Sequence, residues 1–490
     1  MQITESPEIK IIRERVNHIY QYRRDQLTIN LLGYAGGSEY INARLSRFAG
    51  ESTIPWEGGN RGDGSVVTGR KNQAHCAPNL RRIIDKITQF LMAIEPERDV
   101  SDTTILDNIT RDGITVNQFM ADISVKLNVC GWCWLGIDMP RVDQPETLSL
   151  QQKEIAKIRP YWLAYSPLDV VDWAFDNQGN LLWLLALGEE RDNFDPYRKE
   201  KVRKYRALWQ PGMVTKYIYG TDSDIIIGQE VIPFTYSGVP FVLVGTPSKA
   251  PHIFDDLERV NRSIMDLESC SRQNFFEMMF PQMYLSASVL DSTCEKLKVE
   301  PKEALQYIVG LHYPLLLAEG DVIPGYIMPP VGEMGGLRTE IKELRAALYD
   351  AVGLMLRSES KQQQTAESKA WDHLDIEQML SSQAEMLEEA ERVAVRISHE
   401  WDPTFPEYDP KYNRKFNISD LVQDMQTLIL SAQLAMPDEM MKLVLRKVYK
   451  VITKIGGSDI TEEEKQSILD AIDNYNRNPM LSTENEQENY

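Results

Sequence analysis

Residues 64–71 are the first stretch whose spacing suggests chemistry. Their sequence, GSVVTGRK, approaches the P-loop pattern that cradles the phosphates of a nucleotide. The stretch lacks the Lys-Ser or Lys-Thr ending that reaches phosphate and magnesium, and no apolar strand precedes it. The glycine-rich residues around it are typical of a long surface loop. We therefore expect a loop here and no nucleotide site.

The cysteines offer a second candidate, because Cys130 and Cys133 form a CxxC pair. A redox-active pair needs a helix N-terminus or a similar positive environment that stabilises the thiolate. Trp134, Leu135 and Ile137 instead continue a strand pattern, which predicts buried structural thiols. No second pair is present to complete a zinc site. Five cysteines, an odd number in a long chain, indicate reduced thiols in a cytosolic compartment.

Histidines and carboxylates give no stronger catalytic pattern. His75 and Cys76 are adjacent but have no further ligand nearby, and the chain contains neither HExxH nor Gly-x-Ser-x-Gly. Neighbouring carboxylates at 255–256 and 388–389 fall on helical patterns, where we expect a solvated surface. The sequence therefore predicts no catalytic residue, no metal site and no cofactor, and we expect that the protein is not an enzyme.

Charge limits the classes of partner. The 490-residue chain carries a formal net charge of −20, with 53 basic and 73 acidic residues. Proteins that bind nucleic acid tightly by releasing counterions need a basic face, so general DNA or RNA binding is disfavoured. An acidic surface does suit a wall past which a polyanion slides without adhering. Apolar runs are too short to span a bilayer, so no membrane association is expected.

The longest predicted element is a helix at 365–401, which holds neither proline nor glycine. Asp402 and Pro403 end it, because proline disfavours helical geometry in the preceding residue. The pattern allows a coiled coil or a spine that crosses a large domain or a subunit boundary, and the short heptad run favours the spine. A narrow apolar stripe marks the packing face: Leu380, Leu387, Ala390, Ala394, Ile397 and Trp401. We expect aspartate at Leu387 or Ala390 to impair assembly.

The remaining elements predict an α+β chain. Residues 1–50 read mainly as helix, and amphipathic helices are predicted at 79–94 and 117–129. Short aromatic and β-branched runs with turn signals then predict a mainly β unit at about 130–247. Helical patterns return at 252–279 and 337–356, separated by a small insert of short strands. A strand is expected at 414–418, followed by further helices.

Four stretches of the chain resemble portal proteins of tailed bacteriophages, within a portal-like family long known only as a domain of unknown function. They are ARLSRF with NLRRIIDKITQFLMAIEPER, LNVCGWCWLGIDMPR, RPYWLAYSPLDVVDWAF, and QQQTAESKAWDHLDIEQMLSSQAEMLEEAERVAVRISHEW. The order of the elements resembles the portal order of wing, stem helix, clip, stem helix, tunnel loop, spine helix and crown. The resemblance implies the phage portal fold.

The resemblance also implies a role for each part of the chain. The implied ranges are a wing at 1–249 with its mainly β middle at 130–247, stem helices at 250–280 and 333–356, a clip at 281–332, a tunnel loop at 357–364, the spine helix and a return strand of the wing at 365–412, a helical crown at 413–475, and a disordered tail at 476–490. Residues on the second stem helix and the tunnel loop become candidates for weak contact with DNA: Arg338, Lys342, Arg345, Arg357, Lys361, Gln362, Gln363 and Gln364.

The implied function is that of a structural conduit. A ring of about twelve subunits would sit at one capsid vertex, in contact with the major capsid protein, and double-stranded DNA would pass through it during packaging and ejection. The clip would dock the large terminase subunit and later a head-completion or adaptor protein. The implied location is the virion, with assembly in the host cytoplasm. Two alternatives remain open: a phage-encoded DNA-processing enzyme, and another head–tail connector protein.

Overall fold

The computed structural model describes residues 6–46, 74–100, 104–140, 158–192, 201–220, 225–279, 282–286, 295, 315–317, 325–327, 333–352, 366–414 and 416, with single residues and short runs between 442 and 472. Residues 1–416 form one compact unit and 417–490 form another. Every named helix and strand belongs to the first unit. This mixture of helices and sheets is consistent with the expected α+β class.

Helices make up most of the described residues before the first strand. They are α1 (Pro7–Glu14), α2 (His18–Ala35), α3 (Gly37–Arg44), α5 (Asn79–Leu91), the short 3-10 helix η1 (Leu106–Asn108) and α6 (Val116–Cys130). Asn17 caps α2 through its side chain, and Thr115 with Gln118 forms a capping box at the start of α6. At the end of α6, Gly131 adopts a φ of 85° against the ring of His252, where a Cβ would approach to 3.0 Å.

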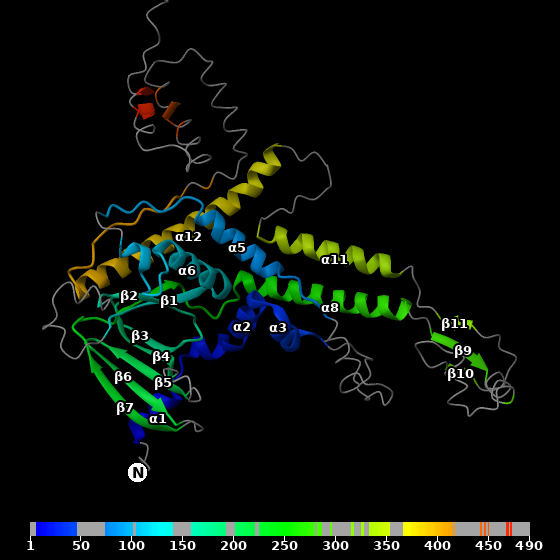
Figure 1. Cartoon of the computed structure of the whole chain (residues 1–490), viewed down its shortest axis with the longest axis horizontal. Helices are drawn as coiled ribbons and strands as arrows, with labels where there is room; N and C mark the ends of the chain where they lie inside the picture. Colours follow the sequence, from blue (N-terminus) through cyan, green and yellow to red (C-terminus); the bar gives the residue numbers. More distant parts are fainter. Residues whose placement is uncertain are drawn as a thin grey trace, which may run out of the picture. The chain divides into compact units, whose positions relative to one another are not determined.

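Two antiparallel sheets stack face to face in the β part of the unit (Figure 1). The smaller has the order β2-β1-β8, with bounds Tyr161–Tyr165, Trp132–Asp138 and Phe241–Gly245. The larger is a meander of β3 (Val170–Phe175), β4 (Leu181–Asp192), β5 (Lys201–Gln210), β6 (Met213–Tyr219) and β7 (Ile226–Pro233). Aromatic residues fill the space between them, with Trp134 of β1 near Trp209 of β5 and Phe241 of β8.

Helices cover the outer face of each sheet. On the meander, Tyr20 of α2 packs over Val171 and Leu185. On the smaller sheet, α12 (Ala366–Trp401) and α6 contact the face that the meander leaves open. The unit therefore has the layers helix, sheet, sheet, helix, as a two-faced sheet requires.

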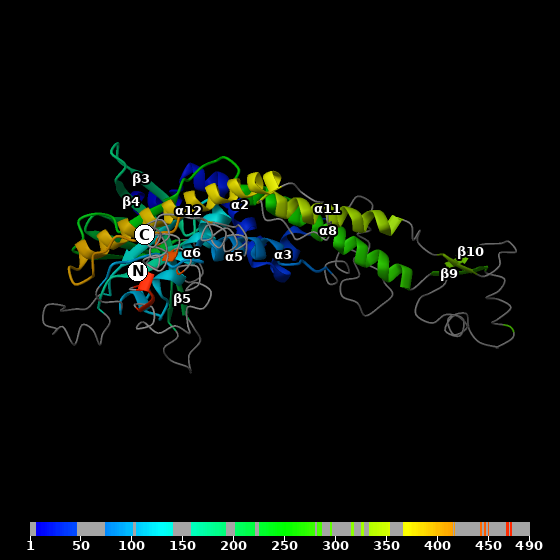
Figure 2. The same cartoon turned by 90° about the horizontal axis from the view of Figure 1, so that it is seen from above.

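A pair of long helices extends from this layered body. α8 (Ile253–Met279) and α11 (Glu333–Asp350) lie side by side in both views (Figures 1 and 2). Ile341 and Leu348 form the buried side of α11. Between these helices the chain carries a small sheet of order β10-β9-β11, with bounds Leu315–Leu317, Gln282–Ser286 and Gly325–Ile327.

The predicted helices at 79–94, 117–129 and 252–279 are confirmed as α5, α6 and α8, with ends that differ by at most three residues. The helix expected at 337–356 begins earlier, at Glu333, and residues 353–356 lie outside the described part. The strand expected at 414–418 was wrong where it can be checked, because Arg414 and Phe416 are not in a strand. An isolated bridge between Glu97 and Lys411 ties the chain back to the body instead.

Candidate functional site

The cations expected to meet DNA fall into two groups. Arg338 and Lys342 are exposed on α11, four residues apart and hence on one side of the helix. Arg345 lies on the same side but donates a hydrogen bond to Glu268 of α8, so it braces the helix pair. The other candidates lie outside the described residues: Arg357, Lys361, Gln362, Gln363 and Gln364.

Acidic residues occupy a different side of α11. Glu340 and Glu343 are exposed and are spaced three residues apart, and Asp350 follows seven residues later. At about 100° per residue, Arg338 and Lys342 flank the buried side of α11 on one side, Glu340 flanks it on the other, and Glu343 and Asp350 lie nearly opposite it. α11 thus presents a cationic flank and an acidic outer face.

A buried ion pair fixes the start of α8 to the N-terminal helices. Arg23 of α2 donates two hydrogen bonds to the carboxylate of Asp255, at 2.6 and 3.0 Å. Asn30 and the backbone N–H of His252 donate two more, at 2.8 and 2.9 Å. Burial alone would raise the pKa of Asp255, but the hydrogen bonds from Arg23 and Asn30 lower it below its ordinary value. The carboxylate is therefore a structural anion.

Two further carboxylates on the same face of α8 are held similarly. Glu258 accepts hydrogen bonds from Nε and Nη2 of Arg44 at 2.8 and 3.0 Å and from the hydroxyl of Tyr40 at 3.1 Å. Asp266 accepts hydrogen bonds from the backbone N–H and the hydroxyl of Ser46, at 2.8 and 2.5 Å. This face of α8 is consequently locked to the segment 40–46 and is not exposed to solvent.

Glu391 organises a third buried cluster, on α12. Nε and Nη2 of Arg98 donate to its carboxylate at 2.6 and 3.0 Å. The hydroxyls of Tyr408 and Tyr412 donate to the same carboxylate, at 3.1 and 2.6 Å. Burial raises the pKa of both tyrosines, and the neighbouring carboxylate raises it further. All four lone-pair positions of a fully buried carboxylate are thereby used, which joins three distant segments of the chain.

The CxxC pair lies in an environment that disfavours the thiolate. Cys130 and Cys133 are buried free thiols. Burial raises the pKa of Cys130 to about 12, and it raises that of Cys133 as well. A thiol with such a pKa stays protonated at neutral pH and is a poor nucleophile. In the part of the chain that the structure describes, no group of three His, Cys, Asp or Glu residues is arranged to hold a metal ion.

The adjacent carboxylates at 255–256 and 388–389 are not simply solvated, which corrects the expectation from sequence. Asp255 and Glu388 are buried and hydrogen-bonded, whereas their neighbours Asp256 and Glu389 face solvent. Glu388 accepts hydrogen bonds from Arg392 and Arg414 at 3.0 and 2.8 Å, whereas the side chain of Glu389 is 61% exposed. Neither pair provides the two facing carboxylates that acid–base catalysis needs.

The apolar stripe of α12 packs against this chain's own core. Every residue named for it is buried: Leu380, Leu387, Ala390, Ala394, Ile397 and Trp401. Polar contacts on the same side fix the register, since Gln383 and Asn128 exchange hydrogen bonds and Trp162 donates to Ser398. Of the two spines that the sequence allowed, one crossing a large domain and one crossing a subunit boundary, these contacts favour the first.

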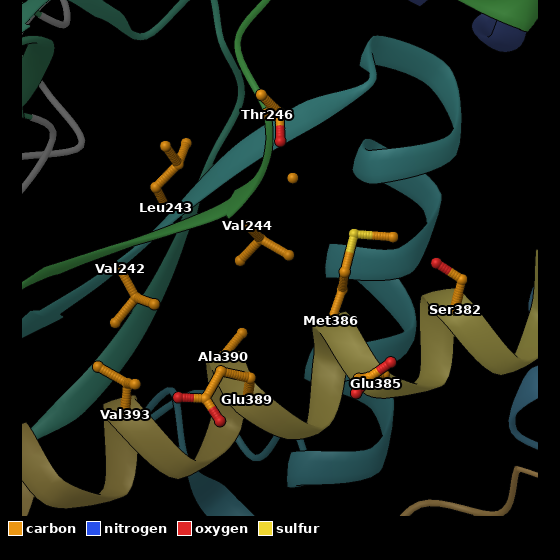
Figure 3. A pocket seen from close by; sticks show the side chains of 11 residues that line it. Val242, Leu243, Val244, Thr246, Ser382, Glu385, Met386, Glu389, Ala390 and Val393 are labelled. Atoms are coloured by element: carbon orange, nitrogen blue, oxygen red, sulfur yellow. The ribbon is translucent and has the colours of Figure 1, made fainter. Parts of the chain in front are cut away.

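A groove runs between β8 and α12 (Figure 3). Its volume is about 420 Å³. Val242 and Val244 point from the strand toward the helix, and Met386, Ala390 and Val393 complete the apolar lining. The rim is polar, with Thr246, Ser382, Glu385 and Glu389. We call this feature the β8–α12 groove. Sequence reasoning missed it, because it depends on the spacing between two elements far apart in the chain.

No protein-family model matches the chain, and no curated protein matches it. Among the described helices, none is both long and apolar enough to cross a membrane. Function must therefore be inferred from the arrangement of the elements and from the charged residues.

Proposed function

We propose that the chain is the portal subunit of a tailed bacteriophage. Copies of it form a ring at one capsid vertex, and double-stranded DNA passes through the ring during packaging and ejection. One observation carries the proposal: α8 and α11 pair across an inserted small sheet, and the 36-residue helix α12 follows and crosses the body. This order resembles stem helix, clip, stem helix and spine helix.

The anchoring of α8 supports a rigid structural role for the helix pair. The ion pair between Asp255 and Arg23 is almost fully buried, and Glu258 is equally well enclosed. Removing one partner of such a pair is strongly destabilising, so the geometry is firmly specified. The wall of a channel needs helices that hold one orientation while a polymer moves past them.

Charge also supports a DNA conduit. A net charge of −20 repels phosphate, which keeps DNA from adhering to the wall. The exposed pair Arg338 and Lys342 supplies a place for brief contacts on one flank of α11.

The partners follow from the proposed role. A ring of about twelve subunits closes by rotation. Residues 281–332 serve as the clip that docks the large terminase subunit during packaging and an adaptor protein afterwards. Residues 413–475 form the crown and the body contacts the major capsid protein. The subunit performs no catalysis and needs no cofactor.

The test is the mass of the purified protein by light scattering, with electron microscopy of the same fraction. Twelve subunits of 56.2 kDa give a closed ring of roughly 670 kDa with a central hole. A protein that stays monomeric at all concentrations and cleaves or joins DNA would overturn the proposal in favour of a DNA-processing enzyme. In the control, we expect the ring fraction neither to cleave nor to join DNA, whether or not a chelator is added.

A further inference from the structure

The outer edge of β8 carries backbone groups that pair with no other described strand. In the smaller sheet β1 is central, and among the described residues no strand pairs with the other side of β8. The backbone N–H of Ile137 donates to the carbonyl of Pro240. In an antiparallel pair every second residue bonds to the partner strand, so the hydrogen-bonded residues that follow on β8 are 242 and 244. Val242 and Val244 therefore bond to β1, and the N–H and C=O of Leu243 point away from the sheet.

This free edge opens into the β8–α12 groove. Leu243, Gly245 and Thr246 line the groove together with the two valines. A strand laid along the edge would bond to Leu243 and would place every second side chain over Met386 and Ala390. Natural proteins usually cover or charge an edge strand, so an edge beside an apolar groove indicates a docking surface.

The rim of the groove indicates the charge of its occupant. Glu385 and Glu389 are exposed on the same side of α12. The ion pairs in which they take part join four carboxylates, those of residues 385, 388, 389 and 409, to two guanidinium groups, those of Arg392 and Arg414. The local excess of negative charge favours a basic segment and disfavours a second copy of this acidic chain.

We propose that β8 and the β8–α12 groove bind an extended, basic segment of a partner protein, which adds as an outer strand to the sheet β2-β1-β8. The segment carries small apolar residues at alternate positions, which enter the groove, and a lysine or arginine that meets Glu385 and Glu389. Backbone hydrogen bonds give affinity, and the groove and its rim give selectivity. This docking surface does not depend on the proposed portal function.

A fluorescent peptide tests the proposal. The probe alternates valine and threonine and has lysine at each end, and a matched peptide has glutamate at each end. We expect the lysine peptide to bind the full-length protein and to saturate in fluorescence anisotropy, and the glutamate peptide to bind at least tenfold more weakly.

Two variants separate the backbone contact from the charge contact. Leu243→Pro removes an N–H that β1 does not use, so the sheet keeps its ladder while the edge loses a donor. We expect affinity to fall about fivefold or more, as loss of one backbone hydrogen bond implies. The double variant Glu385→Lys, Glu389→Lys should weaken the lysine peptide and strengthen the glutamate peptide, and it remains informative if the proline variant fails to fold.

Glu400→Lys is the matched control, because it makes the same charge change on the same helix outside the groove. It should leave both affinities unchanged. Equal binding of the two peptides, or no binding of either, would overturn the proposal. So would a Glu400→Lys variant that loses as much affinity for the lysine peptide as the Glu385→Lys, Glu389→Lys variant does. So would a doubling of mass on concentration that Leu243→Pro abolishes, because the occupant would then be a second copy of the chain.

Discussion

At the scale of single residues, the molecule is marked by carboxylates that sit inside the fold with fully satisfied hydrogen bonds. Asp255, Glu258 and Glu391 are each almost completely buried, and each is paired with an arginine from a distant segment. A buried pair contributes little net stability compared with a well-packed apolar substitute. It does penalise any arrangement that separates the partners, so these pairs specify how the helices are placed.

The first prediction concerns Glu391→Gln. The change leaves the Arg98 guanidinium buried without a counter-charge, so we expect a loss of about 3–5 kcal/mol in the free energy of unfolding. Urea denaturation followed by tryptophan fluorescence measures it. Glu389→Gln, the same chemical change at an exposed position two residues away, should alter stability by less than about 0.5 kcal/mol. If Glu391→Gln lowered the free energy of unfolding as little as Glu389→Gln does, the pair with Arg98 would not need the charge of Glu391.

At the scale of elements, α12 uses different sides for different tasks. Its apolar stripe packs on α6, β1 and β8 within the chain. Glu391 on the same helix receives Arg98, Tyr408 and Tyr412, and an outer side forms one wall of the β8–α12 groove. The described part of α12 therefore acts as an internal support of the body.

The second prediction follows for Leu387→Asp. Leu387 is fully buried, so aspartate there must either stay charged in an apolar site or be protonated, and both states cost free energy. We expect the isolated subunit to lose several kcal/mol of stability or fail to fold, as is typical of an unpaired buried charge. Gln378→Asp places the same side chain at an exposed site of the helix and should be nearly neutral. Thermal unfolding followed by circular dichroism measures the stability of the isolated subunit. If Leu387 instead lay at a subunit interface, the Leu387→Asp subunit would fold normally but would not assemble.

The elements of the fold were largely predictable because their signals are local. The 3.6-residue period located α5, α6 and α8, and aromatic and β-branched runs located the strands of the meander. The candidate site was less predictable. Arg23 and Asp255 are 232 residues apart, and nothing near either residue in the sequence identifies its partner. The buried members of the carboxylate pairs were missed for the same reason, since burial is set by packing between distant elements.

At the scale of the whole molecule, the proposed function makes the distribution of charge the feature that governs contact with DNA. An assembly of subunits that each carry −20 repels a duplex except where cations face it. Arg345 is engaged by Glu268, which leaves Arg338 and Lys342 as the exposed cations of the described part of α11. Weak contacts of this kind are strongly weakened by salt, because each neutralised phosphate releases counterions.

The third prediction is that the double variant Arg338→Gln, Lys342→Gln reduces DNA contact without affecting the ring. Each lost phosphate contact should make the slope of log affinity against log salt concentration shallower by about 0.9. Anisotropy of a labelled duplex at several salt concentrations measures the slope, and light scattering checks that the mass is unchanged. Arg24→Gln with Arg396→Gln removes two exposed cations on α2 and α12, outside the helix pair, and is the matched control. If both double variants change the slope equally, DNA samples the whole surface and the α11 flank has no special role. If only the α11 variant changes it, that flank faces the duplex, as the proposed ring requires.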